Sequence, residues 1–315
     1  MTAVAGPPAT PPRAERGSSA VGRAPGGGAG AGSPPPPEVR VFPDAGALAA
    51  AAADEVVRAL GAAIAERGTA SLVLSGGSTP RPVYRLLGEP PRRGAVDWGA
   101  VQIFWGDERA VPPSHPESNF RLAREALLSR VPLAPGSVHR IAGELPAAEA
   151  AAAYETALRA ALGEELAFDL VLLGLGADGH TASLFPGDDA GEGRTAAGRA
   201  AVAASAPEPP RGRVTLTYEA LAAAREVVFL VVGEGKAEAA ARALAGVPAG
   251  TDAAGADSED AQATDVDGEG AGAVGRGDGT APGRVVPAAR VRPRSGRVLW
   301  LLDAAAVSRL PEGAR

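Results

Sequence analysis

Short runs of apolar residues alternate with longer stretches in which apolar residues recur every three or four positions, from residue 38 onward. The short runs predict strands, and the longer stretches predict helices that bury one face. Strands are expected at 38–42, 71–74, 101–105, 138–141, 169–173, 214–217, 227–232 and 298–302. Helices are expected at 44–67, 80–87, 119–128, 147–162, 218–224, 235–245 and 303–310. This alternation predicts an α/β fold: a three-layer, Rossmann-like, mostly parallel sheet with helices on both faces.

Two segments lack this pattern. Residues 1–37 consist mainly of Ala, Gly, Pro and Ser, and residues 249–283 contain eight acidic residues and a single base, Arg276. Neither segment has enough β-branched and aromatic residues to offset the entropy cost of ordering, so we expect both to be disordered. Residues 38–315 are expected to form a single domain that the acidic insert interrupts.

Composition excludes several classes of protein. The 315 residues carry a formal net charge of −6 and include three histidines and no cysteine. The lack of cysteine excludes disulfides and thiolate metal sites, and with so few histidines we expect no metal and no cofactor. The absence of a long basic run argues against nucleic acid as a partner. No uncharged apolar stretch reaches about 18 residues and no secretion signal is evident, so we expect no membrane contact and a cytoplasmic protein.

In a parallel sheet, ligands bind beyond the carboxyl ends of the strands, so the residues after each strand are the candidates for chemistry. The first such segment, after strand 71–74, contains Ser75, Gly76, Gly77, Ser78 and Thr79. Glycine lets the backbone approach a ligand closely, and the first amides of a helix favour an anion. The segment is either an anion site or an ordinary turn between a strand and a helix.

A second segment, 174–181, begins with the spacing G-x-G-x-x-G. Dinucleotide binding needs a long helix after this motif and an acid about 20 residues on. Pro186 and the lack of an acid near 197–204 therefore exclude that reading. Asp178 and His180 remain: an imidazole suits general-base duty and a carboxylate can orient it, although a structural histidine is the alternative.

Two further segments follow predicted strands. Asp107, Glu108 and Arg109 come after strand 101–105 and form either a catalytic cluster or a solvated loop. Asn119 begins the next predicted helix. Lys236, the only lysine in the chain, follows strand 227–232 and is either a phosphate partner or a surface lysine.

Taken together, these segments resemble the 6-phosphogluconolactonase family, across about residues 38–248 and 284–315. Five pieces occur in the order found in that family. They are Ser75–Pro80, Trp105–Arg109, Glu117–Phe120, Gly174–Pro186 and Gly233–Lys236. The segments 213–217 and 287–289 also resemble parts of the family. The resemblance implies the fold of the sugar-phosphate isomerase/deaminase superfamily.

It also implies hydrolysis of 6-phosphoglucono-δ-lactone to 6-phosphogluconate, in the oxidative pentose phosphate pathway. His180 would activate water, Asp178 would orient His180, and Arg109 would stabilise the oxyanion or hold the phosphate. The phosphate-binding residues would be Ser75, Gly76, Gly77, Ser78, Thr79 and Lys236, and the supporting residues Asp107, Glu108 and Asn119. The expected partner is a small sugar-phosphate lactone, and the expected state is a monomer or weak homodimer.

Two alternatives belong to other functional classes. Glucosamine-6-phosphate deaminases share the fold, but they typically continue the Asp-Gly-His core with Phe-Asn-Glu-Pro, where this chain has Ser183–Pro186 and no acid. They also usually have tyrosine at the position of Arg109. A non-catalytic sugar-phosphate sensor is disfavoured because Asp178 and His180 are both present and no DNA-binding segment is recognisable.

Overall fold

The computed structural model describes residues 36–194, 197–245 and 285–310. The segments expected to be disordered, 1–37 and 249–283, lie outside these ranges apart from residues 36 and 37. Within the described ranges, no helix combines the length and apolarity needed to cross a membrane.

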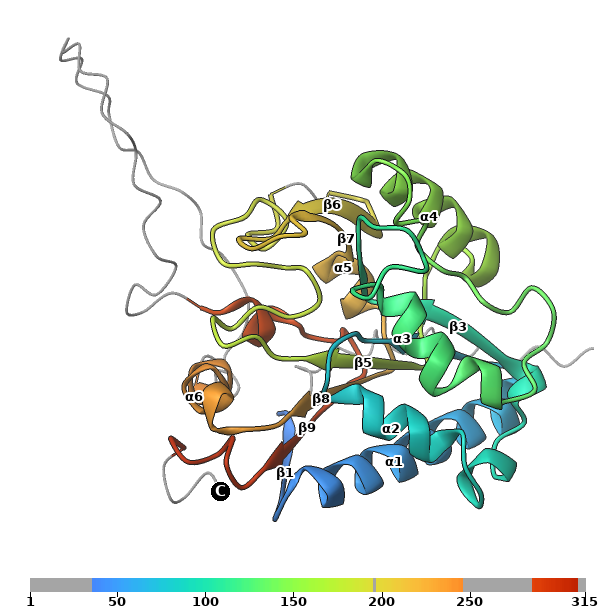
Figure 1. Ribbon diagram of the computed structural model, residues 1–315, viewed down its shortest axis with the longest axis horizontal. Helices are drawn as coiled ribbons and strands as arrows, with labels where there is room; N and C mark the ends of the chain where they lie inside the picture. The colour runs from blue at the N-terminus through green and yellow to red at the C-terminus, as the bar shows by residue number, and fades with distance from the viewer. Residues whose placement is uncertain (1–35, 195–196, 246–284, 311–315) are drawn as a thin grey trace, which may run out of the picture. The chain divides into compact units, whose positions relative to one another are not determined.

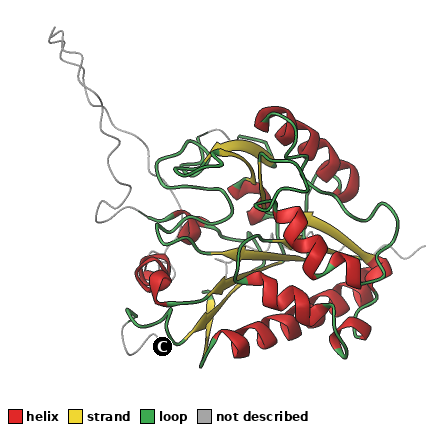
Figure 2. Ribbon diagram, viewed as in Figure 1, coloured by secondary structure: helices red, strands yellow, loops and turns green. Residues whose placement is uncertain are grey.

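A six-stranded sheet forms the centre of the described residues (Figures 1 and 2). Its strands are β1 (Glu38–Phe42), β2 (Ala70–Leu74), β3 (Val101–Trp105), β5 (Leu170–Gly174), β8 (Glu226–Val231) and β9 (Arg297–Asp303). They run in the order β1-β9-β8-β5-β2-β3, and each neighbouring pair is parallel. Every residue of β2 and β8 is buried, as expected for strands covered on both faces. The expected α/β class with a mostly parallel sheet is confirmed.

Helices cover both faces of this sheet. They are α1 (Ala45–Arg67), α2 (Pro80–Leu87), α3 (Asn119–Ala126), α4 (Ala147–Leu162), α5 (Tyr218–Ala222) and α6 (Ala237–Ala245). Figure 1 shows α1 and α2 on one side of the sheet and α4 on the other. The Asp44 side chain caps α1 by accepting from Ala47 N (2.8 Å), and Gly68 ends the helix with φ of 77°. Both termini of α1 therefore follow the signals in the sequence.

A second, antiparallel sheet was not expected. Its strands are β4 (Asp107–Arg109), β6 (Ala201–Ser205) and β7 (Gly212–Leu216), in the order β4-β7-β6. Helix α4 packs on β6 and β7. The pattern missed β4 because it has three polar residues, and missed β6 because it consists mainly of alanine. The segment 107–109 is thus a short strand rather than a solvated loop.

Two other expectations were wrong. The strand expected at 138–141 is reduced to a single bridge between Val138 and Ile103, because the polar pair His139 and Arg140 interrupts the apolar run. The helix expected at 303–310 is a series of turns, in which the Asp303 carboxylate accepts from Ala306 N (2.9 Å). The backbone hydrogen bonds of this segment, Ala306 N to Asp303 O and Leu310 N to Val307 O, reach back three residues and not the four of an α-helix.

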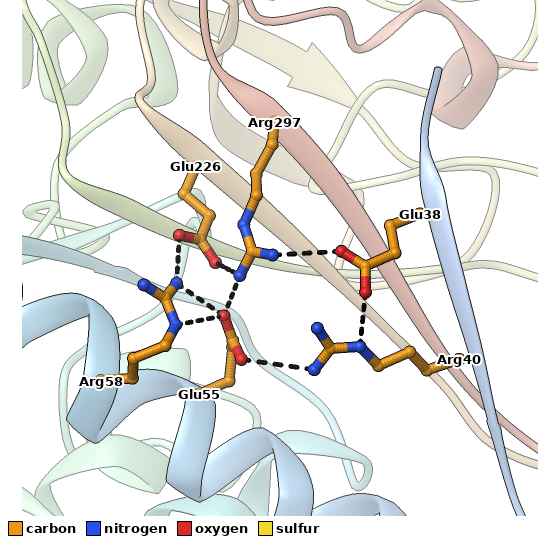
Figure 3. Close-up of polar contacts among 6 residues, drawn as sticks. All are labelled: Glu38, Arg40, Glu55, Arg58, Glu226 and Arg297. Carbon is orange, nitrogen blue, oxygen red and sulfur yellow. Dashed lines mark hydrogen bonds and ion pairs between the residues drawn. The ribbon is translucent and has the colours of Figure 1, made fainter. Parts of the chain in front are cut away.

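The amino edge of the six-stranded sheet carries a network of three glutamates and three arginines (Figure 3). Its members are Glu38, Arg40, Glu55, Arg58, Glu226 and Arg297. Arg297 in β9 lies 2.8 Å from Glu226 in β8 and 3.1 Å from Glu38 in β1. It also pairs with Glu55 of α1. The network therefore ties three strands and the longest helix together at one end of the sheet.

The carboxyl ends of the strands form the opposite edge of the sheet. Across the sheet, the direction in which successive strands are added changes between β2 and β5. β2 lies between β3, the next strand of this sheet along the chain, and β5. Loops that leave β2 and β5 diverge at such a point, and a crevice opens between them. The segments 75–79 and 175–180 begin at this position.

Candidate active site

A cavity of about 200 Å³ lies at this point in the sheet. It is lined by Ser75, Gly76, Gly77, Ser78, Thr79, Pro80, Asp107, Arg109, Asn119, Gly174, Leu175, Gly176, His180, Ala182 and Lys236. The structure thus brings together all the site residues expected from the sequence except Asp178 and Glu108. Those two carboxylates contact residues of the lining from behind.

His180 and Asp178 form a direct pair. The Asp178 Oδ1 atom lies 2.6 Å from His180 Nδ1 and also accepts from the His180 backbone N–H (3.1 Å). Burial of Asp178 favours its neutral form, but the hydrogen bonds and charge of His180 outweigh burial and lower the pKa of Asp178. An ionised carboxylate assigns the proton to Nδ1 and leaves Nε2 as the basic nitrogen.

The loop that carries this pair depends on glycine. Gly179 has φ of 91°, and a Cβ at this position would lie 2.6 Å from the Val286 side chain. The Gly179 carbonyl also accepts from Ala288 N (3.1 Å). A residue with a side chain would therefore be strained and would displace the segment that supports the loop. Beyond His180, residues 181–194 form turns instead of the long helix of a dinucleotide site.

Arg109 is held by one end of its guanidinium group. Its Nη1 donates to Glu117 O (2.8 Å) and Asn119 Oδ1 (2.7 Å), whereas Nε is buried and has no hydrogen-bond partner among the described residues. A buried donor without a partner costs about 1–3 kcal/mol. Arg109 also lines the cavity, so its positive charge lies beside the space that a ligand would occupy.

Asp107 and Asn119 connect Arg109 to the loop that carries His180. Asn119 Nδ2 donates to the Asp107 carbonyl (2.9 Å), and Ser183 Oγ donates to Asp107 Oδ2 (2.7 Å). All three of these side chains are buried. Since Asn119 also accepts from Arg109, one chain of hydrogen bonds joins two sides of the cavity.

Glu108 is almost completely buried and acts on the start of helix α3. Its carboxylate accepts from the backbone N–H groups of Arg109, Asn119 and Phe120 at 2.7–2.8 Å, and from Ser118 Oγ (3.1 Å). Burial raises the pKa of Glu108 in spite of these donors. Glu108 does not line the cavity. It fixes the helix terminus that presents Asn119 to Arg109.

The loop after β2 is anchored by Tyr84 of α2. The tyrosine hydroxyl accepts from Ser75 N (2.9 Å) and donates to Ser75 O (2.7 Å). Gly76 lies against Asn119, where a Cβ would approach Oδ1 to 1.8 Å. Thr79 is the N-cap of α2 but makes no capping hydrogen bond with its side chain. The glycine is therefore needed for close packing, and the Thr79 hydroxyl is not used in capping the helix.

Lys236 ends a short 3-10 helix, Glu234–Lys236, after β8. The turn before it is fixed by Asp303, whose carboxylate accepts from Gly233 N at 3.0–3.1 Å. Lys236 lines the cavity and forms no ion pair with any residue that the structure describes. This arrangement leaves a positive charge at the cavity wall.

Four supporting residues escaped the reasoning from sequence. They are Tyr84, Ser183, Thr215 and Asp303. Ser183 N donates to Thr215 Oγ1 (3.2 Å), so β7 holds the loop of His180. Asp303 gave one signal, since it directly follows the last predicted strand. Ser183 contacts Thr215 and Asp107, which are 32 and 76 positions away, so local pattern cannot report these contacts. Tyr84 contacts Ser75 nine positions earlier, across the turn from β2 to α2.

The other two histidines lie elsewhere. His115 is exposed in its loop, and His139 stacks on Phe104 with ring centroids 4.6 Å apart. The described ranges contain no group of three or more His, Cys, Asp or Glu residues arranged to hold a metal ion.

Residues 43–264 match the family model described as glucosamine-6-phosphate isomerases/6-phosphogluconolactonase. The chain belongs to this family. The 6-phosphogluconolactonase of Mycobacterium tuberculosis is 42% identical over 228 residues, which cover 69% of this chain and 90% of that protein. The 6-phosphogluconolactonase of Streptomyces coelicolor is 38% identical over 282 residues, which cover 86% and 94%.

A solved structure of a family member supports the same assignment. The 6-phosphogluconolactonase from Trypanosoma cruzi matches with a TM-score of 0.67 and 29% identity, covering 87% of this chain and 97% of that one. The family and the fold inferred from the five motifs are thus both confirmed.

Proposed function

We propose that the protein is a 6-phosphogluconolactonase, an enzyme that hydrolyses 6-phosphoglucono-δ-lactone to 6-phosphogluconate. One observation carries the proposal. A histidine paired with a carboxylate, and an arginine and a lysine that have no ion-pair partner among the described residues, all line one cavity. The names of the relatives agree with this chemistry.

His180 is the general base in this proposal. Its Nε2 accepts a proton from water as the water oxygen bonds to the lactone carbonyl carbon, and the carbonyl electrons move onto the carbonyl oxygen. The intermediate then collapses: the bond from that carbon to the ring oxygen breaks, and the ring oxygen takes the proton from His180. The resulting carboxylic acid loses its proton to solvent. Asp178 stabilises the imidazolium between these steps.

Two groups of residues would bind the negatively charged parts of the substrate. Ser78, Thr79 and the backbone N–H groups of their loop suit the phosphate, with Lys236 as its counter-charge. Arg109 lines the same cavity, and its guanidinium group suits the oxyanion or the phosphate. Ser75 and the two glycines after it keep the backbone close enough to donate.

The deaminase alternative needs an acid in the loop after His180. The corresponding stretch, Ser183–Pro186, has none, and Phe185 is buried against His180. A carboxylate there would have to displace that ring. This observation favours lactone hydrolysis over ring opening of an amino sugar.

The test is hydrolysis of fresh lactone. We would generate 6-phosphoglucono-δ-lactone in place and follow 6-phosphogluconate formation above the spontaneous rate. The expected result is a large acceleration that His180→Ala reduces by about 10²–10⁴-fold in kcat, the usual contribution of a general base. His139→Asn is the matched control, because His139 lies outside the cavity, and it should keep the wild-type kcat.

Two outcomes would contradict the proposal. If the wild type gave no acceleration, glucosamine 6-phosphate turnover and then simple binding of sugar phosphates would be tested. Binding without turnover would indicate a sensor. If His180→Ala kept the wild-type kcat, the general base would be another group.

A further inference from the structure

The imidazole of His180 is confined on three sides. Asp178 pairs with Nδ1, and Gly176 lies so close that a Cβ there would be 2.0 Å from the same nitrogen. The third side is the ring of Phe185, whose centroid lies 4.6 Å from that of His180 with the planes tilted by 45°. One hydrogen bond holds a ring at a single point. The contact with Phe185 therefore limits rotation of the imidazole about that point.

Phe185 does not take part in forming the cavity wall. Its residue is 7% exposed, and it is absent from the lining that includes His180 and Ala182. Leu184 N donates to Thr181 O (2.9 Å), which turns the chain so that Phe185 lies back over the imidazole. Any effect of this ring on a substrate must therefore pass through His180.

A buttress holds Phe185 from behind. Gly191 packs on the Phe185 backbone so tightly that a Cβ would lie 1.7 Å from the Phe185 carbonyl oxygen. The Gly191 carbonyl accepts from the Tyr218 hydroxyl (2.8 Å) and from Arg290 Nη1 (2.9 Å). Arg290 also lies over the Tyr218 ring, 4.7 Å from its centroid. Tyr218 and Arg290, from two distant parts of the chain, thus hold Gly191 against the backbone of Phe185.

We propose that Phe185 is a positioning residue: its ring sets the orientation of His180, and with it the direction of Nε2, without touching the substrate. The kinetic consequence rests on the proposed function. The orientation of the imidazole itself can be measured without a substrate. The two parts of the proposal therefore have separate tests.

The kinetic test compares Phe185→Leu with Phe185→Tyr. Leucine is apolar and buried as readily, but it lacks the flat face, whereas tyrosine keeps the ring. Misplacing a catalytic group by about 1 Å can cost up to about 10²-fold in rate. We expect Phe185→Leu to lower kcat by about 10-fold with KM within about 2-fold, and to change the pH profile of kcat. Phe185→Tyr should restore most of the wild-type kcat.

Phe168→Leu is the matched control. Phe168 is fully buried and makes an edge contact with Phe104, away from the cavity. It should lower the melting temperature without changing kcat. Wild-type kcat in Phe185→Leu would overturn the proposal. An equal loss of kcat in both Phe185 variants, in step with their melting temperatures, would also overturn it, since that pattern marks a purely structural residue.

The second test is the ¹⁵N spectrum of the His180 ring in the full-length protein without substrate. We expect the wild type to show one tautomer with the proton on Nδ1, and Phe185→Leu to show shifted, averaged ring resonances. Unchanged resonances would overturn the positioning role. If the wild type proved inactive on the lactone, the proposed function would fail, and this spectrum would still decide the role of Phe185.

Discussion

The two edges of the central sheet use charge in opposite ways. At the amino edge, three glutamates are matched by three arginines, and Glu55 and Glu226 are buried within the network (Figure 3). At the carboxyl edge, the carboxylates of Asp107 and Glu108 accept hydrogen bonds from hydroxyl, amide and backbone donors. Neither carboxylate forms an ion pair with a described arginine or lysine side chain. Arg109 has no carboxylate partner among the described residues, and its guanidinium donates to a backbone carbonyl and to the Asn119 amide.

The charged residues at the amino edge therefore act on stability, and those at the carboxyl edge are available for ligand binding. Matched charges leave nothing for a ligand, whereas Arg109 and Lys236, which have no ion-pair partner among the described residues, lie at the cavity where an anion would bind. The same six strands contribute to both edges. What differs is which side chains stand at their termini, so each edge can be perturbed without disturbing the other.

The largest expected effect lies at the carboxyl edge. Asp178→Asn keeps the shape of the side chain but removes the charge that stabilises the imidazolium of His180. We expect kcat to fall by about 10²-fold while the melting temperature changes little. Steady-state kinetics and thermal unfolding measure the two quantities. Asp54→Asn, an exposed aspartate on α1, is the control, and a similar loss of kcat there would make the comparison between edges untenable.

The next effect lies at the amino edge and has the opposite signature. Glu55→Gln removes one acid from the network and leaves Arg297 and Arg58 sharing Glu226. Breaking a fully buried pair costs about 3–5 kcal/mol. Because both arginines are partly exposed, we expect about 1–2 kcal/mol of lost stability in denaturant unfolding, with kcat unchanged. Glu66→Gln on the same helix is exposed and should cost less than 0.5 kcal/mol, by the usual size of surface effects.

Lys236→Ala should raise KM about 10-fold and leave kcat nearly unchanged, if the lysine binds the phosphate equally in the ground state and transition state. Lys236→Arg, which keeps the charge, should recover part of the affinity. The same lactone without phosphate should show no difference between wild type and Lys236→Ala. A KM difference between the two proteins with that substrate would contradict the assignment of Lys236 to the phosphate.

The smallest effect concerns pH. Burial raises the pKa of Glu55, but its hydrogen bonds with Arg58 and the charge of Arg297 outweigh burial, so the pKa lies below its ordinary value. A depressed carboxyl pKa stabilises the folded state above the unfolded pKa and loses that effect as pH falls. The melting-temperature gap between wild type and Glu55→Gln should therefore narrow between pH 6 and pH 3. A melting-temperature gap that did not change with pH would mean that the charge of Glu55 does not contribute to stability.

The sequence predicted the elements whose signals are local. Asp44 and Gly68 mark the ends of α1, and the apolar runs mark the six parallel strands. The elements it missed depend on partners elsewhere. Strand β4 is polar and exists because β7 pairs with it, and the segment 138–141 lacks a long partner. Local pattern cannot report pairing that tertiary contacts decide.

The same limit applies to the candidate site. Asp178 and His180 are two residues apart, so their pairing was expected from spacing. Ser183 and Asp107 are 76 positions apart, and their hydrogen bond depends on how β4 and the loop after β5 meet. Phe185 gave no signal of its own, because an apolar residue in a turn is ordinary until its neighbour is known to be His180. The roles of the site residues remain predictions.

The position of β9 has a consequence for how the protein is made. β9 is the last strand of the described chain, yet it lies between β8 and β1, and among the described strands it alone pairs with β1. During synthesis, β1 emerges first and has no strand partner until residues 297–303 have left the ribosome. A nascent chain, or one truncated before Arg297, therefore exposes open edges of both β1 and β8, which invite aggregation. Completion of this sheet must follow translation of its final strand.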